Sequence, residues 1–366
     1  STCPTTSKSD SKGSAQGHAR TATHSQSGTE KQGSAHSKPK AKSKSGKPAK
    51  APVVHSVPYQ RSVEITSPKP LGLTNEGNTC YLNGLLQALL AVPAFWLPSV
   101  QRLHLGIPLI VQKLLETLVS MDRENRARED SRGKSGRVVD TKPLLRELQR
   151  AKAAAGDRSF QWKCQNDAAE VLSTFIAELR KAFGLWEVIA TKPREYLSCE
   201  SCNEATVVEA EVQPYLILEP KGKLHESLED FTWKKTEGQR CTKCGSTQVR
   251  SQNLLHESPM VLVIQLNRSM ADGSKNQTVV DVSSQSLELP TKRENRLVVV
   301  PYSMKAVVCH HSDSTNKGHY VTYARKGNKW YRFDDLYVRA LSSDMVADSL
   351  NTRHAYMYVF EKSAIT

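Results

Sequence analysis

The sequence has no long uninterrupted apolar segment. No stretch reaches the roughly 18 apolar residues that span a bilayer, and the longest candidate, residues 85–98, is interrupted by Gln87 and Pro93. The first residues as printed hold no apolar signal segment either. We therefore expect no membrane contact and an intracellular protein, nuclear or cytoplasmic. Eight cysteines in such a chain indicate thiols and metal ligands rather than a disulfide scaffold.

Acidic and large apolar residues are scarce at the start of the chain. Residues 1–69 hold three acidic and twelve basic residues, and thus +9 of the formal net charge of +14. This Ser-, Lys-, Gly-, Ala- and Pro-rich segment cannot bury enough surface to offset its ordering entropy, so we expect a disordered tail. Its basic cluster, residues 38–50, has three interpretations: a nuclear import signal, a weak nucleic-acid contact, or a solvated linker.

The folded part begins near residue 70, and its first half has a helical pattern. Apolar residues recur with helical spacing from residue 82 to 90, ahead of Pro93. A second apolar segment covers residues 107–119, and the charged, glycine-containing stretch 121–136 that follows predicts a mobile loop. Two further helices are expected, one capped by Asp140 or Thr141 and one from residue 168 to 179.

The second half has the composition of β-strands. "PYLIL", "PMVLVIQL", "RLVVVPYSMKAVVCHH", "GHYVTYARKGNKWYRF" and "HAYMYVF" are rich in β-branched and aromatic residues, and several are continuous apolar runs typical of a buried sheet. Helices followed by antiparallel strands predict the α+β class.

Cys80 lies between the polar run "NEGNT" and the first predicted helix. The free N–H groups and positive dipole end of a helix start favour the thiolate form of a cysteine. Asn75, Gly77 and Asn78 allow a tight turn and offer donors for an oxyanion. The pattern fits a catalytic nucleophile, and equally a capping loop that happens to contain a cysteine.

A nucleophilic cysteine needs a base, and His319 is the candidate. It begins a strand that returns through "KGN" into "KWYRFDD". A two-residue Gly327-Asn328 loop would place Asp334 diagonally beside His319, whereas a three-residue loop would place Asp335 opposite it. Either register supplies a carboxylate to orient the imidazole. The alternative is a strand histidine with a structural role only.

Four other cysteines form two Cys-x-x-Cys pairs, Cys199 with Cys202 and Cys241 with Cys244. Two such pairs fit a structural zinc site with four thiolate ligands and no position left for water. A redox pair is the alternative. Cys3, Cys164 and Cys309 are expected to have no role in either site.

The blocks "GLTNEGNTCYLNGLLQ", "QNDAAEVL" and "GHYVTYARKGNKWYRFDD", with the closing "AYMYVF", resemble the ubiquitin-specific protease family of papain-like deubiquitinases. The resemblance covers residues 70–360 in the family's order. It implies a catalytic domain over residues 70–362 with a helical thumb (about 70–190), zinc-ribbon fingers (about 191–258) and an antiparallel β palm (about 259–362). It also supports the four-cysteine zinc site, because the family's fingers carry such pairs.

The resemblance assigns roles to individual residues. Cys80 would be the nucleophile, His319 the general base, Asp334 the orienting acid, Asn75 the side-chain donor to the oxyanion and Asp335 a secondary polar helper. Asp167 and Glu170, three apart on one helix, would pair with the arginines of ubiquitin's basic C-terminal tail. The alternative is a solvated acid in the first turn of a helix, which applies above all to Asp167 near the helix start. Gln165 would help to order the cleft.

The function implied is a thiol-dependent deubiquitinase that hydrolyses isopeptide or peptide bonds at the C-terminal glycine of ubiquitin, with ubiquitin and ubiquitinated proteins as its partners. The chain departs from the family pattern with Gly84 in place of the usual Ser, Asn166 for Gln, Val171 for an aromatic residue and "NRS" for Lys-Arg-Phe. Two other functions remain open, a catalytically weak ubiquitin-binding scaffold and a protease for another ubiquitin-like modifier. Nucleic-acid binding through the tail is a third.

Overall fold

The computed structural model describes residues 69–131, 136–158, 160–161, 163–184, 186–189, 191–209, 211–234, 239–293, 296–314 and 317–363. The predicted tail up to residue 68, with its basic cluster, lies outside the described residues. No single helix in the described ranges is long and apolar enough to cross a membrane; one pair bent by 83°, Cys80–Leu90 with Pro93–Val100, meets that test by length and composition alone.

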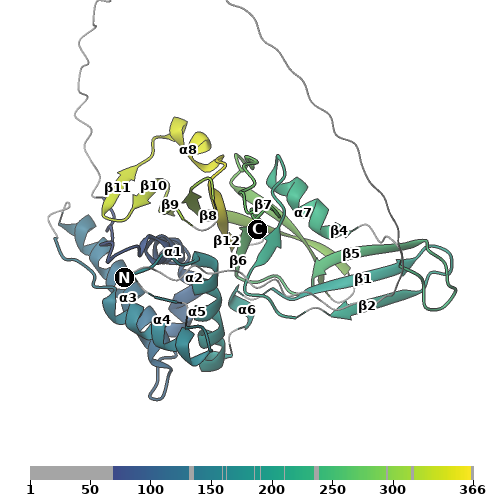
Figure 1. Cartoon of the computed structure of the whole chain (residues 1–366), viewed down its shortest axis with the longest axis horizontal. Helices are drawn as coiled ribbons and strands as arrows, with labels where there is room; N and C mark the ends of the chain where they lie inside the picture. Colours follow the sequence, from purple (N-terminus) through teal and green to yellow (C-terminus); the bar gives the residue numbers. More distant parts are fainter. Residues whose placement is uncertain are drawn as a thin grey trace, which may run out of the picture. The chain divides into compact units, whose positions relative to one another are not determined.

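Helices dominate the first half of the described chain, as predicted (Figure 1). Those that precede the first strand are α1 Cys80–Leu90, α2 Pro93–Val100, α3 Leu109–Asp130, α4 Lys142–Ala154, α5 Ala168–Phe183 and α6 Trp186–Ile189. Two more, α7 Leu224–Thr232 and α8 Ser343–Leu350, are inserted among the strands.

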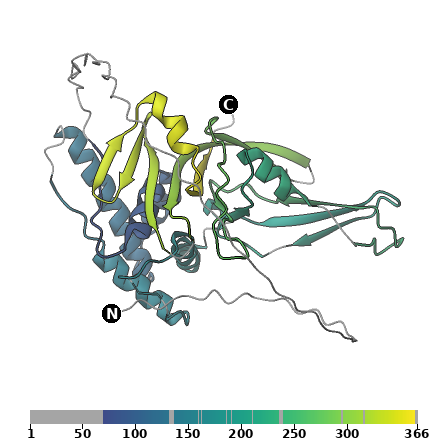
Figure 2. The ribbon, with the colours of Figure 1, turned by 45° about the horizontal axis from the view of Figure 1, so that its top comes forward.

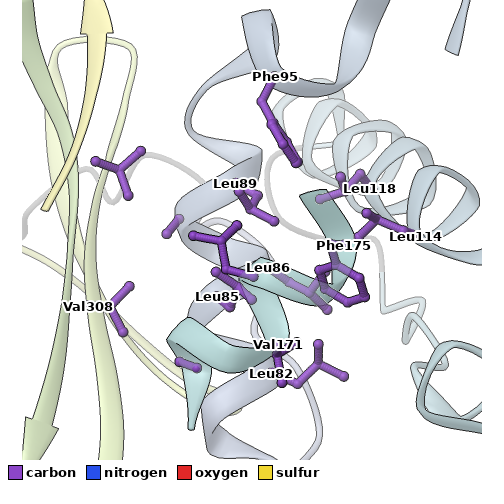
Figure 3. Packing of buried hydrophobic residues seen from close by; sticks show 14 of the residues in the cluster. Leu82, Leu85, Leu86, Leu89, Phe95, Leu114, Leu118, Val171, Phe175 and Val308 are labelled. Atoms are coloured by element: carbon purple, nitrogen blue, oxygen red, sulfur yellow. The ribbon is translucent and has the colours of Figure 1, made fainter. Parts of the chain in front are cut away.

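Helix α1 forms because its leucines recur on one face. Leu82, Leu85, Leu86 and Leu89 are at most 1% exposed, and they meet side chains from α3, α5 and strand β8 in one cluster (Figure 3). The helix ends at Leu90, and Pro93 then begins α2 at a position where its missing N–H is not needed. Proline therefore ends the first helix, as predicted, but the second helix that it begins was not anticipated.

The prediction of a mobile loop over residues 121–136 was wrong for its first ten residues. Helix α3 continues to Asp130, because the charged stretch still has a buried face that contains Met121, Glu124 and Asn125. Within it Arg128 pairs with Glu124 across one turn. Asn125 Oδ1 accepts a 2.7 Å hydrogen bond from the backbone N–H of Leu71.

The two later helices begin at polar caps. Thr141 occupies the N-cap position of α4 without a capping hydrogen bond from its side chain, while Asp140 Oδ1 accepts from Lys142 N at 3.0 Å. The position and the side-chain bond are thus divided between the two predicted candidates. Asp167 caps α5 by accepting from Ala169 N at 2.7 Å. Helix α5 ends at Gly184, whose φ of 65° suits a residue without a Cβ.

The strands form one twelve-stranded sheet. They are β1 Pro193–Cys199, β2 Ala205–Glu209, β3 Leu216–Leu218, β4 Trp233–Lys234, β5 Val249–Leu255, β6 Val261–Leu266, β7 Ser286–Arg293, β8 Arg296–His311, β9 His319–Lys326, β10 Lys329–Asp334, β11 Tyr337–Ala340 and β12 Ala355–Lys362. The main path runs β11-β10-β9-β8-β7-β5-β1-β2, and β12 pairs with both β8 and β6. In Figure 2 the neighbouring strands β9 to β11 are yellow-green to yellow.

Each predicted strand is present, although β1, β2, β4, β5, β7 and β11 were missed. Pairing is antiparallel as expected except between β3 and β6 and at the single pair Leu255↔Thr291 of β5 and β7. The continuous apolar runs occur because alternate side chains of a strand enter two different apolar clusters, one on each face of the sheet. Val261 and Val263 of β6 face the helical cluster, whereas Leu262 and Ile264 belong to a second cluster that includes side chains of α7 and α8. Both faces of this strand are therefore buried.

We predict that Asn125→Ala lowers the free energy of unfolding by about 1–3 kcal/mol, because it leaves the buried Leu71 N–H without an acceptor. Urea unfolding would measure it. The matched control is Arg126→Ala on the same helix, whose side chain is 72% exposed and should cost less than about 1 kcal/mol. Equal losses from the two substitutions would contradict the proposed role of Asn125.

Candidate active site

Cys80 is the first residue of α1, and the turn before it is held by Asn75 and Thr79. Asn75 Oδ1 accepts from the backbone N–H groups of Gly77 at 3.1 Å and Thr79 at 3.0 Å, and Thr79 Oγ1 accepts from Glu76 N at 2.9 Å. Gly77 and Asn78 have φ values of 97° and 57°, which suit glycine and asparagine. The thiol thus lies at the positive end of a helix.

His319 and Asp334 meet because the hairpin has the shorter of its two predicted loops. Lys326 pairs with Lys329 across Gly327-Asn328, and the register continues to Thr322↔Phe333. His319 Nε2 lies 2.6 Å from Asp334 Oδ1. The three-residue alternative, with Asp335 opposite His319, is wrong.

Asp334 has a second cationic partner that sequence reasoning missed. Arg332 Nη2 lies 2.8 Å from Asp334 Oδ2. Burial acts to raise the pKa of Asp334, but the His319 hydrogen bond and the charge of Arg332 outweigh it and hold this pKa below its usual value. Arg332 points to the same side of β10 as Asp334, two residues away, and this spacing was the available signal.

The His319 ring lies between the Cys80 thiol and the Asp334 carboxylate. The neighbouring Cys80 thiol is the largest influence on the pKa of His319 and, with the hydrogen bond to Asp334, raises it to about 9 against the opposing effect of burial. Because Nε2 bonds to Asp334, Nδ1 is the ring nitrogen that remains available for the thiol. The imidazolium form is therefore stabilised between its two neighbours.

Asp335 does not contact His319 through any hydrogen bond of the described residues but joins two asparagines of the Cys80 segment. Its carboxylate accepts from Asn75 Nδ2 at 2.9 Å and from Asn83 Nδ2 at 2.7 Å. Its carbonyl accepts from Leu73 N at 3.0 Å. At Gly72 any Cβ would lie 2.5 Å from the Leu336 carbonyl oxygen, so glycine permits this approach.

Asn75 retains one donor for a ligand. An amide has two N–H donors, and one is used by Asp335. Asn83 was missed by sequence reasoning, although it is, with Gln87, a polar residue on a mainly apolar helix and is only 2% exposed. Such a residue needs buried partners, and this was the signal for its role.

Gln165 connects the segment before α5 to the residue before His319. Its Oε1 accepts from Gly318 N at 2.9 Å, and its Nε2 donates to Gly318 O. A Cβ at Gly318 would collide with the His310 ring and the His311 carbonyl. The predicted ordering residue therefore lies beside the candidate site.

Asp167 and Glu170 lie at the start of α5, outside the group formed by Cys80, His319 and Asp334. Asp167 caps this helix, a role that was not predicted, and both of its oxygens also accept from Tyr356 OH of β12, at 2.9 and 2.8 Å. Glu170 is exposed, with Lys152 Nζ 3.8 Å from its Oε2.

The four cysteines of the two pairs come together at one end of strands β1 and β5. Their sulfur atoms lie within 4.8 Å of one another, and two of the Sγ–Sγ distances are 3.6 Å. Tetrahedral zinc with Zn–S distances of about 2.3 Å separates its sulfurs by roughly 3.8 Å. The two turns match, since Asn203 N donates to Cys199 O and Gly245 N to Cys241 O, each at 2.9 Å.

The electrostatics of these thiols also fit a cation. Burial acts to raise the pKa of Cys199, but N–H groups of Cys202 and Ser201 lower it to about 6. The Glu204 N–H acts to lower the pKa of Cys202, yet burial and the other three thiols raise it to about 12. A metal ion among the four sulfurs would stabilise all of them in the thiolate form. His319, Asp334 and Asp335 also lie close together, but each is already hydrogen-bonded within the protein.

An α+β fold that joins a helix-start thiol to an imidazole and a carboxylate has the arrangement of a thiol hydrolase. The chain belongs to the ubiquitin carboxyl-terminal hydrolase family, whose model matches residues 71–360. This match confirms the resemblance found in the sequence.

Named relatives are consistent with this membership. Ubiquitin carboxyl-terminal hydrolase 36 of Drosophila melanogaster is 28% identical over 323 residues, which cover 79% of this chain and 30% of that protein. Ubiquitin carboxyl-terminal hydrolase 8 of Saccharomyces cerevisiae is 23% identical over 325 residues, 75% of this chain and 68% of that protein. The chain spans about a third of the length of the Drosophila relatives it matches.

Solved structures show the same fold. A chain of the SAGA Ubp8/Sgf11/Sus1/Sgf73 DUB module bound to ubiquitin aldehyde aligns with a TM-score of 0.63 and 22% identity, over 81% of this chain and 70% of that one. A second structure of this module, bound to monoubiquitin, has a TM-score of 0.62 and 20% identity over the same shares. The predicted fold class, with helical thumb, β palm and fingers, is confirmed.

We predict that His319 titrates near pH 9, measured by NMR of its ring. Because this pKa lies above the usual 6.5, the protonated ring contributes its full stabilisation below pH 6.5 and loses it as the pH rises through 9. Cys80→Ser and Asp334→Asn should each lower the pKa, since each weakens a contact of the ring. Asp230→Asn on α7 removes the same charge elsewhere and should leave it unchanged. A native value of 6.5 or below would contradict the ion-pair geometry.

Proposed function

We propose that this chain is a thiol-dependent deubiquitinase that hydrolyses isopeptide or peptide bonds at the C-terminal glycine of ubiquitin. The observation that carries the proposal is the His319 ring, which bonds to Asp334 through Nε2 and has its pKa raised by the neighbouring Cys80 thiol at the start of α1. Family membership supplies the substrate class. A structure with this fold is described as bound to ubiquitin aldehyde, which supports ubiquitin as the partner.

In the proposed mechanism His319 Nδ1 takes the proton of Cys80, and the thiolate attacks the carbonyl carbon of the terminal glycine. Asn75 Nδ2 and backbone N–H groups at the start of α1 stabilise the oxyanion. His319 then gives its proton to the departing amine, which leaves a thioester. Water, deprotonated by His319, hydrolyses the thioester and regenerates the thiol. Asp334 holds the ring and stabilises the imidazolium throughout.

Asp335 would act through Asn75 in this mechanism. Its bond to Asn75 Nδ2 directs one amide hydrogen away, and the rigid amide plane then fixes the direction of the other. For the basic tail of ubiquitin, Glu170 is the more exposed of the two predicted acids, while the Asp167 carboxylate is already shared between Ala169 and Tyr356. Gln165 would hold the segment before His319 in place.

Zinc is the metal proposed for the four-cysteine cluster. Thiolate ligands with tetrahedral spacing favour zinc, and four protein ligands leave no open position, so the ion would be structural. Cys199, Cys202, Cys241 and Cys244 would hold it. Catalysis requires no further cofactor in this proposal. The catalytic domain would comprise residues 70–362, in a protein that works in the nucleus or cytoplasm.

The proposed activity predicts a covalent adduct between Cys80 and ubiquitin that carries a C-terminal electrophile. Mass spectrometry of the folded, metal-loaded chain should locate the adduct at Cys80, and Cys80→Ala should abolish it. Ubiquitin binding without an adduct would favour the weak-scaffold alternative, and reaction only with another ubiquitin-like modifier would favour the second alternative. No adduct and no binding with either would overturn the function proposed.

The zinc proposal predicts one zinc ion per folded chain by elemental analysis. Replacing Cys199 and Cys241 together by serine should remove it, because two thiolates bind zinc far more weakly than four. Cys309→Ser is the matched control, as Cys309 is a fully buried thiol outside the cluster, and its zinc content should be unchanged. Well-folded native protein without metal would refute the site.

A further inference from the structure

Helix α1 packs directly against strand β9 at Gly84. A Cβ built there would lie 2.8 Å from Thr322 Oγ1, 3.7 Å from Tyr320 Cβ and 3.9 Å from Val308 Cγ1. The first distance is shorter than any real Cβ contact. The backbone of the helix therefore rests on the strand without a side chain of its own between them.

Thr322 limits how far helix α1 can move away from strand β9. Its Oγ1 donates a 2.9 Å hydrogen bond to the carbonyl oxygen of Gly84, and the threonine is completely buried. A buried hydroxyl without a partner costs about 1–3 kcal/mol, so the helix cannot move away without loss. A carbonyl oxygen has two lone pairs, so this bond is compatible with the helical bond to the same atom.

The two residues are close in sequence to the reacting groups. Gly84 follows Cys80 by one helical turn, and Thr322 follows His319 by three residues on the same strand. Both segments are regular secondary structure over these intervals, which makes them stiff on this scale. A shift between helix and strand at Gly84 is therefore transmitted to the gap between the thiol and the imidazole.

We propose that Gly84 and Thr322 form a positioning pair that sets the separation between Cys80 and His319. The missing side chain at residue 84 fixes the closest approach, and the threonine hydroxyl fixes the largest. Neither residue touches a reacting atom. For catalysis the inference rests on the function proposed above, but its geometric content concerns the thiol and the ring alone.

The test compares Thr322→Val, which keeps the shape but removes the donor, with Thr322→Ser, which keeps the hydroxyl. The measurements are the rate of Cys80 alkylation by iodoacetamide at pH 7, followed by mass spectrometry, and the NMR titration of His319. Thr322→Val should lower the alkylation rate about tenfold, corresponding to a His319 pKa lower by about one unit. Thr322→Ser should keep near-native values.

Gly84→Ala tests the other limit, because it adds only the Cβ that meets Thr322 Oγ1. It should reduce alkylation by a similar factor, and the double variant Gly84→Ala/Thr322→Ala should recover part of the rate because the obstructing atom is gone. If Gly84→Ala fails to fold, the two Thr322 variants decide the question.

Thr117→Val is the matched control. It removes a buried threonine hydroxyl that donates 2.7 Å to the Lys113 carbonyl of helix α3, so it should affect stability without changing Cys80 reactivity. Native alkylation and titration in folded Thr322→Val would overturn the proposal, as would equal changes in Thr117→Val. Neither readout uses ubiquitin. Failure to form the ubiquitin adduct would therefore leave this inference intact, and failure of this inference would leave the proposed ubiquitin chemistry intact.

Discussion

The contact between helix α1 and strand β9 joins the two halves of the candidate site, and the rest of the arrangement depends on it. The bonded residues Gly84 and Thr322 are 238 positions apart in the sequence. Closing so long a segment costs entropy that local interactions cannot offset. The cost is met by the apolar cluster that α1 shares with α3, α5 and β8 (Figure 3). The site is therefore a product of the complete fold.

Two adjacent carboxylates at the end of β10 have different partners and different roles. Asp334 is the last residue of the strand and directs its side chain to His319 and Arg332. Asp335 has a φ of 50°, so the backbone turns there and the second carboxylate faces Asn75 and Asn83 instead. One acid thus stabilises charge on the base, while its neighbour fastens the segment before the nucleophile. A single backbone conformation separates the two roles.

Local patterns in the sequence were sufficient for the elements that carry the reacting groups. Leucine spacing predicted α1 with Cys80 at its start, and the Gly327-Asn328 loop limited the carboxylate opposite His319 to two candidates. The register of this hairpin could not be decided from the sequence. Asp334 and Asp335 are adjacent in the chain, so only the folded loop determines which of them meets His319. The role of Asn83 depends on a partner 252 residues away, which no local pattern reveals.

The error in α3 has a similar physical origin. Its last ten residues are strongly charged, and charge together with the following glycine favours a loop. The buried side chains Glu124 and Asn125 are satisfied by Arg128 and by the Leu71 backbone. Polar residues therefore extend the helix through specific partners. The Arg128 partner follows from i,i+4 spacing, but the Leu71 backbone is a distant partner that the sequence does not identify. The same stretch holds the start of the Cys80 segment in place. The residues that were wrongly predicted to form a loop therefore help to support the candidate site.

The arm formed by β1, β2 and β5 depends on a different constraint from the rest of the sheet. Every residue of β2 is exposed, and β5 joins β7 through the single pair Leu255↔Thr291. Such an arm buries too little apolar surface to fix its own end. The four cysteines lie at that end, where the Cys199 and Cys241 turns meet. A metal ion bound there would supply the free energy that a hydrophobic core supplies around α1. The two predicted sites are thus stabilised by different interactions. Loss of a bound metal should loosen the arm and leave the Cys80–His319 contact intact.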